Sequence, residues 1–269
     1  QRRIELNSHL AKVDWGKTQA ISYAGLDGQP LRGLVVLPPD YDPAKRYPLL
    51  VWVYPGTLSR NFAYWNDPYL PGFYNLQLYA ARGYVVVVPS MPRGAGTQLR
   101  EIQAGMQNGV LPAVDRLVEM GIADPNRVGV FGQSLGGYAV NSLITQTNRF
   151  KAAIAIAGNN DLAQSSFQFD PLARGYPGIE HEKSVNWDIL EQGFGLGASP
   201  IDDPELYRRN SPLFDAKKIE TPLLLIHGEF DARGGFPQAE AMFNSLSRQN
   251  KTARLLRYWG ESHSLAQSP

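Results

Sequence analysis

The chain has 269 residues, of which 43% are hydrophobic and 19% are charged, a composition typical of a globular protein with room for one large α/β domain. Its 26 Lys and Arg and 25 Asp and Glu residues leave a formal charge of +1 without a long basic run, so neither nucleic acid nor an anionic membrane is expected as the main partner. No apolar run approaches the roughly 20 residues of a membrane-spanning helix, no signal peptide is visible, and the absence of cysteine excludes disulfides and thiolate sites.

The first half of the chain predicts a β-hairpin followed by alternating strands and helices. Two continuous apolar runs, Leu49–Tyr54 and Tyr84–Val88, have the composition of strands buried on both faces. The expected elements are, in order, strands at residues 18–23, 31–37 and 49–54, a helix at 73–82 with Gly83 as its C-cap, a strand at 84–88 and a helix at 101–120.

The second half continues this alternation with one interruption. Between residues 159 and 219 the pattern is lost, and the aromatic residues, glycines and prolines there predict an irregular insertion with short helices. Around it we expect a strand at 128–131, a helix at 138–147, a strand at 152–157, a strand at 222–227, a helix at 237–249 and a strand at 253–258. This spacing predicts a doubly wound, mostly parallel sheet flanked by helices, with an active site beyond the carboxyl ends of the strands.

The strand at residues 128–131 leads into Gly132-Gln-Ser-Leu-Gly-Gly137, which fits the G-x-S-x-G nucleophile elbow of serine hydrolases. The motif needs a strand before it and a helix after it, and the sequence predicts both. Such a turn would hold Ser134 in a strained conformation with its hydroxyl above the sheet. Side chains at positions 132 and 136 would collide with the neighbouring strand and helix, so glycine is favoured there. Ser134 is therefore the candidate nucleophile.

A serine nucleophile needs a base, and in α/β-hydrolases the base follows the nucleophile and the acid along the chain. Three histidines follow Ser134. His263 lies in a loop after the last predicted strand, where the base is expected. His227 at a strand end is expected to be structural, and His181 in the insertion is expected to be solvated. His263 is therefore the candidate base.

The acid that orients the base should lie between Ser134 and His263 in the chain. Asp231 and Glu229 both follow the strand at residues 222–227. Asp231 is preferred because it lies farther along the loop and can reach the histidine, whereas Glu229 is expected to support the turn.

Two hydrogen-bond donors must stabilise the oxyanion that forms during acyl transfer. One is the backbone N–H of Leu135, the residue after the nucleophile. In lipase-like enzymes the second is a backbone N–H after the third strand, but here that loop reads Tyr54-Pro55-Gly56 and Pro55 has no N–H. The phenol of Tyr54 is one substitute, and a purely structural role as the last core aromatic of its strand is the other; the residues alone leave both open.

Longer motifs resemble the catalytic domain of the prolyl oligopeptidase family of serine peptidases, which includes dipeptidyl peptidases and acylaminoacyl peptidases. They follow the family order through nearly the whole chain, at residues 47–56, 92–94, 123–127, 132–137, 207–212, 221–231, 236–238 and 258–264. The resemblance implies an α/β-hydrolase fold and a triad of Ser134, Asp231 and His263. It also implies that the Tyr54 hydroxyl is the second oxyanion donor.

The resemblance further implies a single peptidase domain over residues 1–269, and no cofactor is expected. The sequence shows no clustered His, Asp and Glu residues with the spacing of metal ligands, so no metal site is expected either. The family places a β-propeller that screens substrates by size before this domain, and this chain leaves no room for one, so we expect it in the full-length protein. The sequence departs from the family pattern in three places. Leu135 stands where several relatives have Tyr, and Arg233-Gly234-Gly235 stands where an apolar residue is usual. The relatives continue past the histidine into a C-terminal helix, whereas this sequence ends at Pro269.

The leading expectation is a serine peptidase that cleaves short peptides through an acyl-enzyme. Aromatic residues of the insertion, Phe167, Phe169 and Trp187, are candidates for a substrate pocket or for the local core of the insertion. One alternative is a carboxylesterase with the same triad, which would turn over esters but not amides. Another is a non-catalytic interaction module, which would not react with a fluorophosphonate probe.

Overall fold

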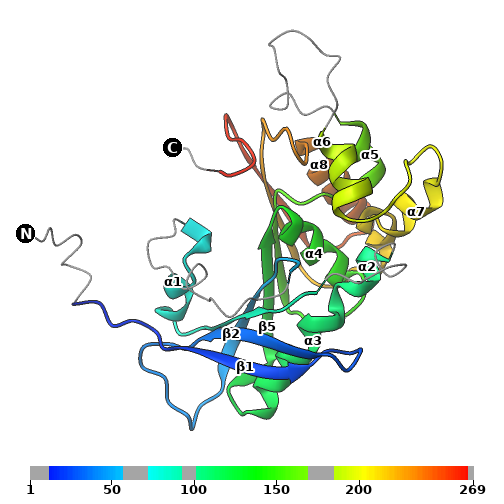
Figure 1. Cartoon of the computed structure of the whole chain (residues 1–269). Helices are drawn as coiled ribbons and strands as arrows, with labels where there is room; N and C mark the ends of the chain where they lie inside the picture. The colour runs from blue at the N-terminus through cyan, green and yellow to red at the C-terminus, as the bar shows by residue number, and fades with distance from the viewer. Residues whose placement is uncertain (1–11, 57–71, 93–100, 169–184, 266–269) are drawn as a thin grey trace, which may run out of the picture.

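The computed structural model describes residues 12–56, 72–92, 101–168 and 185–265, and an eight-stranded sheet runs through them (Figure 1). The strand order is β1-β2-β4-β3-β5-β6-β7-β8. The first two strands pair antiparallel with each other and β2 pairs antiparallel with β4, while every later pairing is parallel. The strands are β1 (Thr18–Ala24), β2 (Pro30–Val36), β3 (Tyr47–Trp52), β4 (Val85–Pro89), β5 (Ala123–Gln133), β6 (Ala152–Ile156), β7 (Leu223–Gly228) and β8 (Ala253–Tyr258). The predicted mostly parallel sheet is confirmed.

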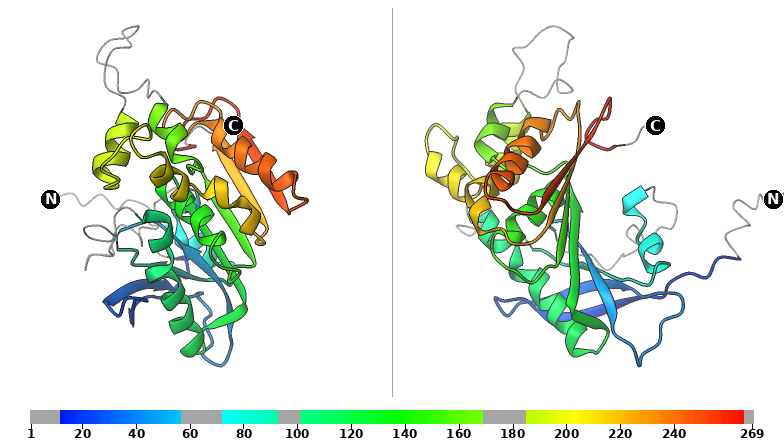
Figure 2. Two further views of the ribbon diagram at one scale, coloured as in Figure 1. Left: turned by 90° about the vertical axis from the view of Figure 1, so that its right-hand side faces the viewer. Right: turned by 180° about the vertical axis from the view of Figure 1, so that it is seen from behind.

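Helices cover both faces of the sheet, as expected for a doubly wound fold. Short α1 (Leu76–Ala80) packs against Trp52 and Phe131 on one face. On the other face, α3 (Gln107–Glu119), α4 (Leu135–Ile144) and α8 (Phe236–Ser247) bury their apolar sides in the larger core. Figure 2 shows the cyan segment that contains α1 across the sheet from these three helices. Within the described residues, no helix is both long and apolar enough to cross a membrane.

Two predicted helices are divided in the structure. The helix expected at residues 73–82 is a 3₁₀ turn, η3 (Gly72–Tyr74), followed by α1. Asn75 separates them because its side chain accepts a hydrogen bond of 3.1 Å from the N–H of Gln77 and so caps a new helix. The helix expected at residues 101–120 consists of α2 (Ile102–Gly105) and α3, and the division follows Gly105, a residue of low helix propensity.

The segment between β6 and β7 contains only short helical pieces, in agreement with the predicted irregular insertion. Figure 1 shows α5, α6 and α7 gathered at one end of the molecule, near α8. These pieces are α5 (Leu162–Phe167), α6 (Val185–Asp188), the π-helical η6 (Ile189–Gly193), α7 (Pro204–Arg209) and the 3₁₀-helical η7 (Pro212–Lys218). Phe169 and His181 of this segment, and the end of the motif at 92–94, lie outside the described residues.

Candidate active site

Ser134 connects β5 to α4 in the strained turn that the elbow motif predicts. Its backbone has φ 60° and ψ −120°, a conformation that a residue with a side chain adopts only at a cost of about 1–3 kcal/mol. Its N–H donates a hydrogen bond of 2.8 Å to Ile156, which ties the turn to the neighbouring strand β6. Although Ser134 is the N-cap of α4, its hydroxyl makes no capping hydrogen bond, so the hydroxyl is available for chemistry.

The glycines beside Ser134 allow the start of α4 to approach the end of β3. A Cβ atom on Gly132 would lie 2.6 Å from the backbone oxygens of both Val53 and Gly136. A Cβ atom on Gly136 would lie 2.3 Å from the oxygen of Val53. These distances are shorter than any packed contact, so the predicted collisions at positions 132 and 136 are confirmed.

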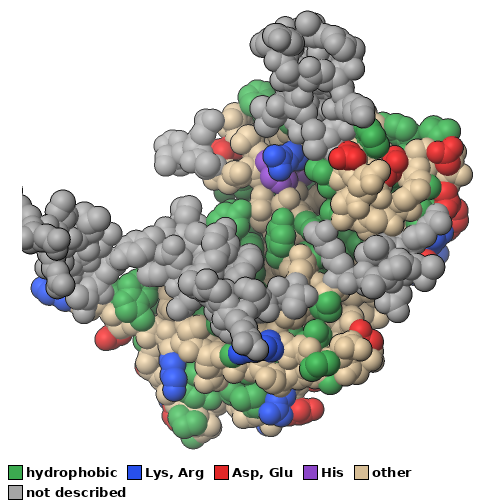
Figure 3. Space-filling view, in the orientation of Figure 1, with side chains coloured by type: hydrophobic (Ala, Val, Ile, Leu, Met, Phe, Trp, Pro, Cys, Tyr) green, Lys and Arg blue, Asp and Glu red, His purple; other side chains and the backbone are tan. Residues whose placement is uncertain are grey.

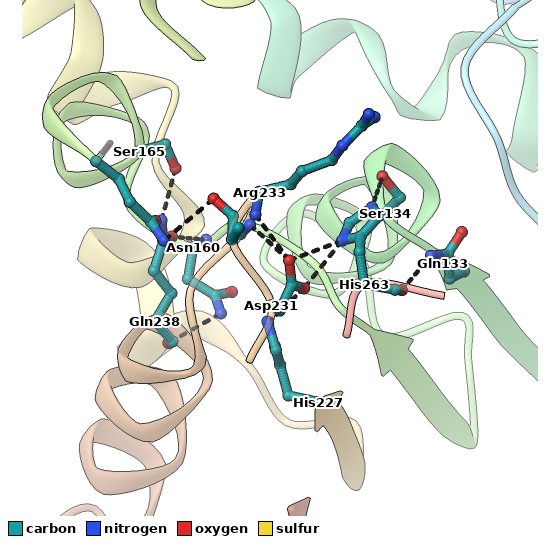
Figure 4. A network of polar contacts seen from close by, with 12 residues as sticks. Gln133, Ser134, Asn160, Ser165, His227, Asp231, Arg233, Gln238 and His263 are labelled. Carbon is teal, nitrogen blue, oxygen red and sulfur yellow. Dashed lines mark hydrogen bonds and ion pairs between the residues drawn. The ribbon is translucent and has the colours of Figure 1, made fainter. Parts of the chain in front are cut away.

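The structure brings Ser134, His263 and Asp231 into one hydrogen-bonded chain (Figure 4). His263 Nε2 lies 2.7 Å from Ser134 Oγ, and His263 Nδ1 lies 2.9 Å from Asp231 Oδ2 and 3.0 Å from Asp231 Oδ1. The three residues follow β5, β7 and β8, so parallel strands deliver them to the same edge of the sheet. An imidazole in this position can accept the serine proton while the carboxylate fixes its orientation.

The Asp231 carboxylate is buried, with 4% of the residue exposed, and it is surrounded by donors. Its Oδ1 accepts hydrogen bonds from the backbone N–H groups of Arg233 at 2.9 Å and Gly234 at 3.1 Å. Burial alone would raise the pKa of Asp231, but its contacts with His227 and His263 outweigh burial and hold the pKa well below the usual range of an aspartate. The carboxylate is therefore ionised and can stabilise an imidazolium on His263.

His227 contacts the same carboxylate from the side opposite His263. Its Nε2 lies 2.9 Å from Asp231 Oδ2, although the pair lacks the alignment of a hydrogen bond. The residue is buried, and its ring packs edge-on against Phe236. Sequence reasoning assigned His227 a structural role and missed this contact. The four-residue spacing to Asp231 at the end of β7 is the signal that could have revealed it.

Glu229, the competing acid, points elsewhere. It forms an ion pair with Arg257 on the neighbouring strand β8. Asp231, and not Glu229, is thus the carboxylate in contact with His263, as the sequence predicts.

Gln133 is a second site residue that sequence reasoning missed. Its Nε2 donates a hydrogen bond of 2.9 Å to the backbone oxygen of His263, and its Oε1 accepts one of 2.9 Å from the hydroxyl of Tyr74. Gln133 is 6% exposed, so both bonds lie in a largely dry environment. A buried amide directly before the nucleophile was the available signal, because a buried polar side chain requires partners.

The two expected oxyanion donors, Leu135 and Tyr54, come from the start of α4 and from the loop after β3. Leu135 is the first residue of α4, so its N–H has no acceptor within the helix and lies at the positive end of the helix dipole. Tyr54 follows β3, and its ring lies 3.4 Å from the position that a Cβ atom on Gly136 would occupy. In the described part of the chain the Tyr54 hydroxyl has no hydrogen-bond partner, and the residue is 38% exposed.

Two of the three aromatic candidates for the substrate pocket, Phe167 and Trp187, lie within the described residues, on α5 and α6. Phe167 at the end of α5 is 63% exposed, and Trp187 in α6 is half-buried. Phe169 lies outside the described residues. Figure 3 shows that the histidine surface of the site lies beside a Lys or Arg side chain, with hydrophobic side chains close by.

Several known sequences are similar to this chain. The sequence profile of the prolyl oligopeptidase family matches residues 72–269. The uncharacterized peptidase YuxL of Bacillus subtilis is 31% identical over 258 residues, which cover 93% of this chain and 36% of that protein. Dipeptidyl-peptidase 5 of Porphyromonas gingivalis is 30% identical over 246 residues, which cover 88% of this chain and 33% of that protein. The chain thus spans about a third of the length of these relatives.

Comparison with solved structures supports the fold. The acylaminoacyl peptidase of Pyrococcus horikoshii matches 98% of this chain and 40% of its own chain, with a TM-score of 0.76 and 23% sequence identity. A crystal structure of Porphyromonas gingivalis dipeptidyl peptidase 4 matches 98% of this chain and 35% of its own chain, with a TM-score of 0.69 and 19% identity. The predicted α/β-hydrolase fold is confirmed by these similarities.

Proposed function

Because this chain belongs to the prolyl oligopeptidase family and is a serine hydrolase of the peptidase type, we propose that it cleaves peptide bonds of short peptides through an acyl-enzyme on Ser134. One observation carries this proposal: an unbroken chain of contacts from Ser134 Oγ through the His263 ring to the Asp231 carboxylate, with distances of 2.7 Å and 2.9 Å. The close approach gives the hydroxyl a base, and without a base a serine is a poor nucleophile at neutral pH.

In the acylation step His263 Nε2 takes the proton of Ser134 as Oγ attacks the carbonyl carbon of the scissile bond. The imidazolium that forms is stabilised by Asp231, whose carboxylate remains ionised. His263 then gives the proton to the leaving amine, the C–N bond breaks, and the acyl group stays on Oγ. A water molecule activated by His263 hydrolyses this ester by the reverse sequence of proton transfers, which restores Ser134.

The negative charge on the carbonyl oxygen needs donors that are in place before the reaction. We assign these roles to the N–H of Leu135 and the hydroxyl of Tyr54. Among the described residues, neither the N–H at the start of α4 nor the phenol beside Gly136 has a hydrogen-bond partner, which supports the assignment. Pro55 provides no amide of its own, so a side-chain donor is needed on that side.

The direct test compares an aminoacyl anilide with a short acyl ester of the same acyl group, at matched concentrations, on the intact protein. Release of the aniline, lost in Ser134→Ala, supports the peptidase. Ester hydrolysis without amide hydrolysis would instead identify a carboxylesterase that uses the same residues.

A further inference from the structure

His227 is a buried histidine that the proposed mechanism does not use, although it contacts the proposed acid. The residue lies at the end of β7 and is 1% exposed, and its Nε2 lies 2.9 Å from Asp231 Oδ2. His263 Nδ1 approaches the same oxygen, also at 2.9 Å, and Figure 4 shows the two rings on different sides of the carboxylate. Two histidines therefore share one carboxylate oxygen, and His263 is the one that reaches Ser134.

The two oxygens of Asp231 have different neighbours. Oδ1 accepts hydrogen bonds from the backbone N–H groups of Arg233 and Gly234, which belong to the same loop as the acid itself. In the ranges that the structure describes, the polar contacts of Oδ2 are the two histidine rings. His227 is thus the group that can fix the orientation of Oδ2 from a strand of the central sheet.

The ring of His227 is itself held in place. It packs edge-on against Phe236, the first residue of α8, with ring centroids 6.2 Å apart. The guanidinium carbon of Arg257 lies 4.8 Å from the centroid of the Phe236 ring and 4.2 Å from that of Trp259. Glu229 forms an ion pair with the same guanidinium. Because these contacts join the end of β7 to α8 and β8, the His227 ring keeps a fixed position beside the carboxylate.

The contact with Asp231 determines which ring nitrogen of a neutral His227 carries the hydrogen. A bare nitrogen at 2.9 Å would place its lone pair against an oxygen of the ionised carboxylate, and the two would repel. An N–H at Nε2 instead places positive charge beside Oδ2 and offsets part of the cost of burying the carboxylate. In agreement, burial raises the pKa of Asp231, and the contacts with His227 and His263 more than reverse that rise.

We propose that His227 is a positioning residue of the triad: its N–H keeps Asp231 Oδ2 directed at His263. Without this N–H, Oδ2 would be held by His263 alone, and the carboxylate could turn about its Cβ–Cγ bond. The base would then be less well aligned with Ser134 during proton transfer. This inference rests on the proposed function, because it concerns the same site.

The test uses the intact protein, an aminoacyl anilide and substitutions of His227 that either keep or remove the N–H. His227→Leu removes the donor, and kcat should fall about tenfold with little change in KM, because the effect passes through the acid and not through substrate binding. His227→Gln places an amide N–H near the position of Nε2 and should recover most of this loss. His227→Asn carries the same amide on a shorter side chain that does not reach Oδ2, so its kcat should resemble that of His227→Leu.

Leu225→Ala is the matched control. Leu225 is buried in the larger core, two positions before His227 in β7 and therefore on the same face of the sheet. Its truncation should lower the thermal unfolding midpoint and leave kcat unchanged, which separates a loss of stability from a loss of alignment.

Full kcat in His227→Leu, or in His227→Asn if the Leu variant does not fold, would overturn the inference and leave the peptidase proposal standing. The same conclusion would follow if His227→Gln were no more active than His227→Leu, or if Leu225→Ala lost kcat to the same extent. Failure of the wild type to cleave the anilide would overturn both.

Discussion

The side-chain amide of Gln133 donates a hydrogen bond of 2.9 Å to the backbone oxygen of His263, so the residue before the proposed nucleophile holds the loop that carries the proposed base. The two residues are 130 positions apart in the chain. Tyr74 completes the connection by donating to the other end of the amide at 2.9 Å. Three segments that meet only in the folded protein are thereby fixed relative to one another.

Replacement of Gln133 by Leu should lower kcat about five- to tenfold and change KM little. The substitution leaves the oxygen of His263 without its donor and lets the histidine loop move relative to Ser134, and a buried hydrogen bond of this kind is worth about 1 kcal/mol. Steady-state kinetics on an aminoacyl anilide measures the effect. Tyr74→Phe, which keeps the bond to His263, should show a smaller loss. Full kcat in Gln133→Leu would mean that the loop is held by other contacts.

Replacement of Tyr54 by Phe should lower kcat by about 10²- to 10³-fold, the loss measured when one oxyanion donor is removed. The ring remains in place against Gly136, so KM and stability should change little. The measurement is kcat on an amide substrate together with the thermal unfolding midpoint. An unchanged kcat would remove Tyr54 from the oxyanion hole.

Replacement of Gly136 by Ala should destabilise the fold by about 1–3 kcal/mol, the range expected for forcing an extra methyl group into a packed site. The new Cβ would lie 2.3 Å from the backbone oxygen of Val53, which cannot move without shifting β3. Gly105→Ala is the control, because a Cβ there meets no atom within 4 Å and Ala favours a helix more than Gly does, so this variant should keep the stability of the wild type or gain up to about 1 kcal/mol. Urea unfolding of the two variants compares them, and equal stabilities would contradict the close-approach argument.

The sequence alone predicts the parallel sheet and the three residues of the proposed triad, because both follow from patterns that lie within short stretches of the chain. Continuous apolar runs mark the parallel strands, and Ser134, Asp231 and His263 each follow one of them. The division of the predicted helix at residues 73–82 was not predicted. It arises because the side chain of Asn75 caps a new helix, and hydrophobic periodicity carries no information about such a cap.

The supporting contacts of the site could not be predicted in the same way. The distance between Gln133 and the His263 loop depends on how β5, β6, β7 and β8 align, and the chain pattern does not specify that alignment. His227 and Asp231 are close in sequence, but their contact depends on how the loop after β7 folds back. Both contacts therefore depend on the assembled sheet and its loops, and the sequence pattern alone does not predict them.

The lowered pKa of Asp231 predicts an acid-dependent loss of stability. A carboxyl group whose pKa is lower in the folded state stabilises the fold above its unfolded pKa of about 3.9, and this stability is lost as the pH falls below that value. The free energy of unfolding of the wild type should therefore decrease between pH 5 and pH 3 more steeply than that of Asp231→Asn. Other carboxyl groups with lowered pKa values, such as Asp124 and Glu205, are common to both proteins and cancel in the comparison. Parallel urea titrations test this, and identical slopes would show that Asp231 is not held as an ion by its histidines.

Activation of Ser134 by His263 is tested most directly by the site of reaction with a fluorophosphonate probe, read by peptide mass spectrometry on the intact protein. We predict one adduct, on the peptide that contains Ser134. The adduct should be absent in Ser134→Ala and should form far more slowly in His263→Ala. An adduct on a different residue, or labelling of Ser134→Ala at the wild-type rate, would contradict the account.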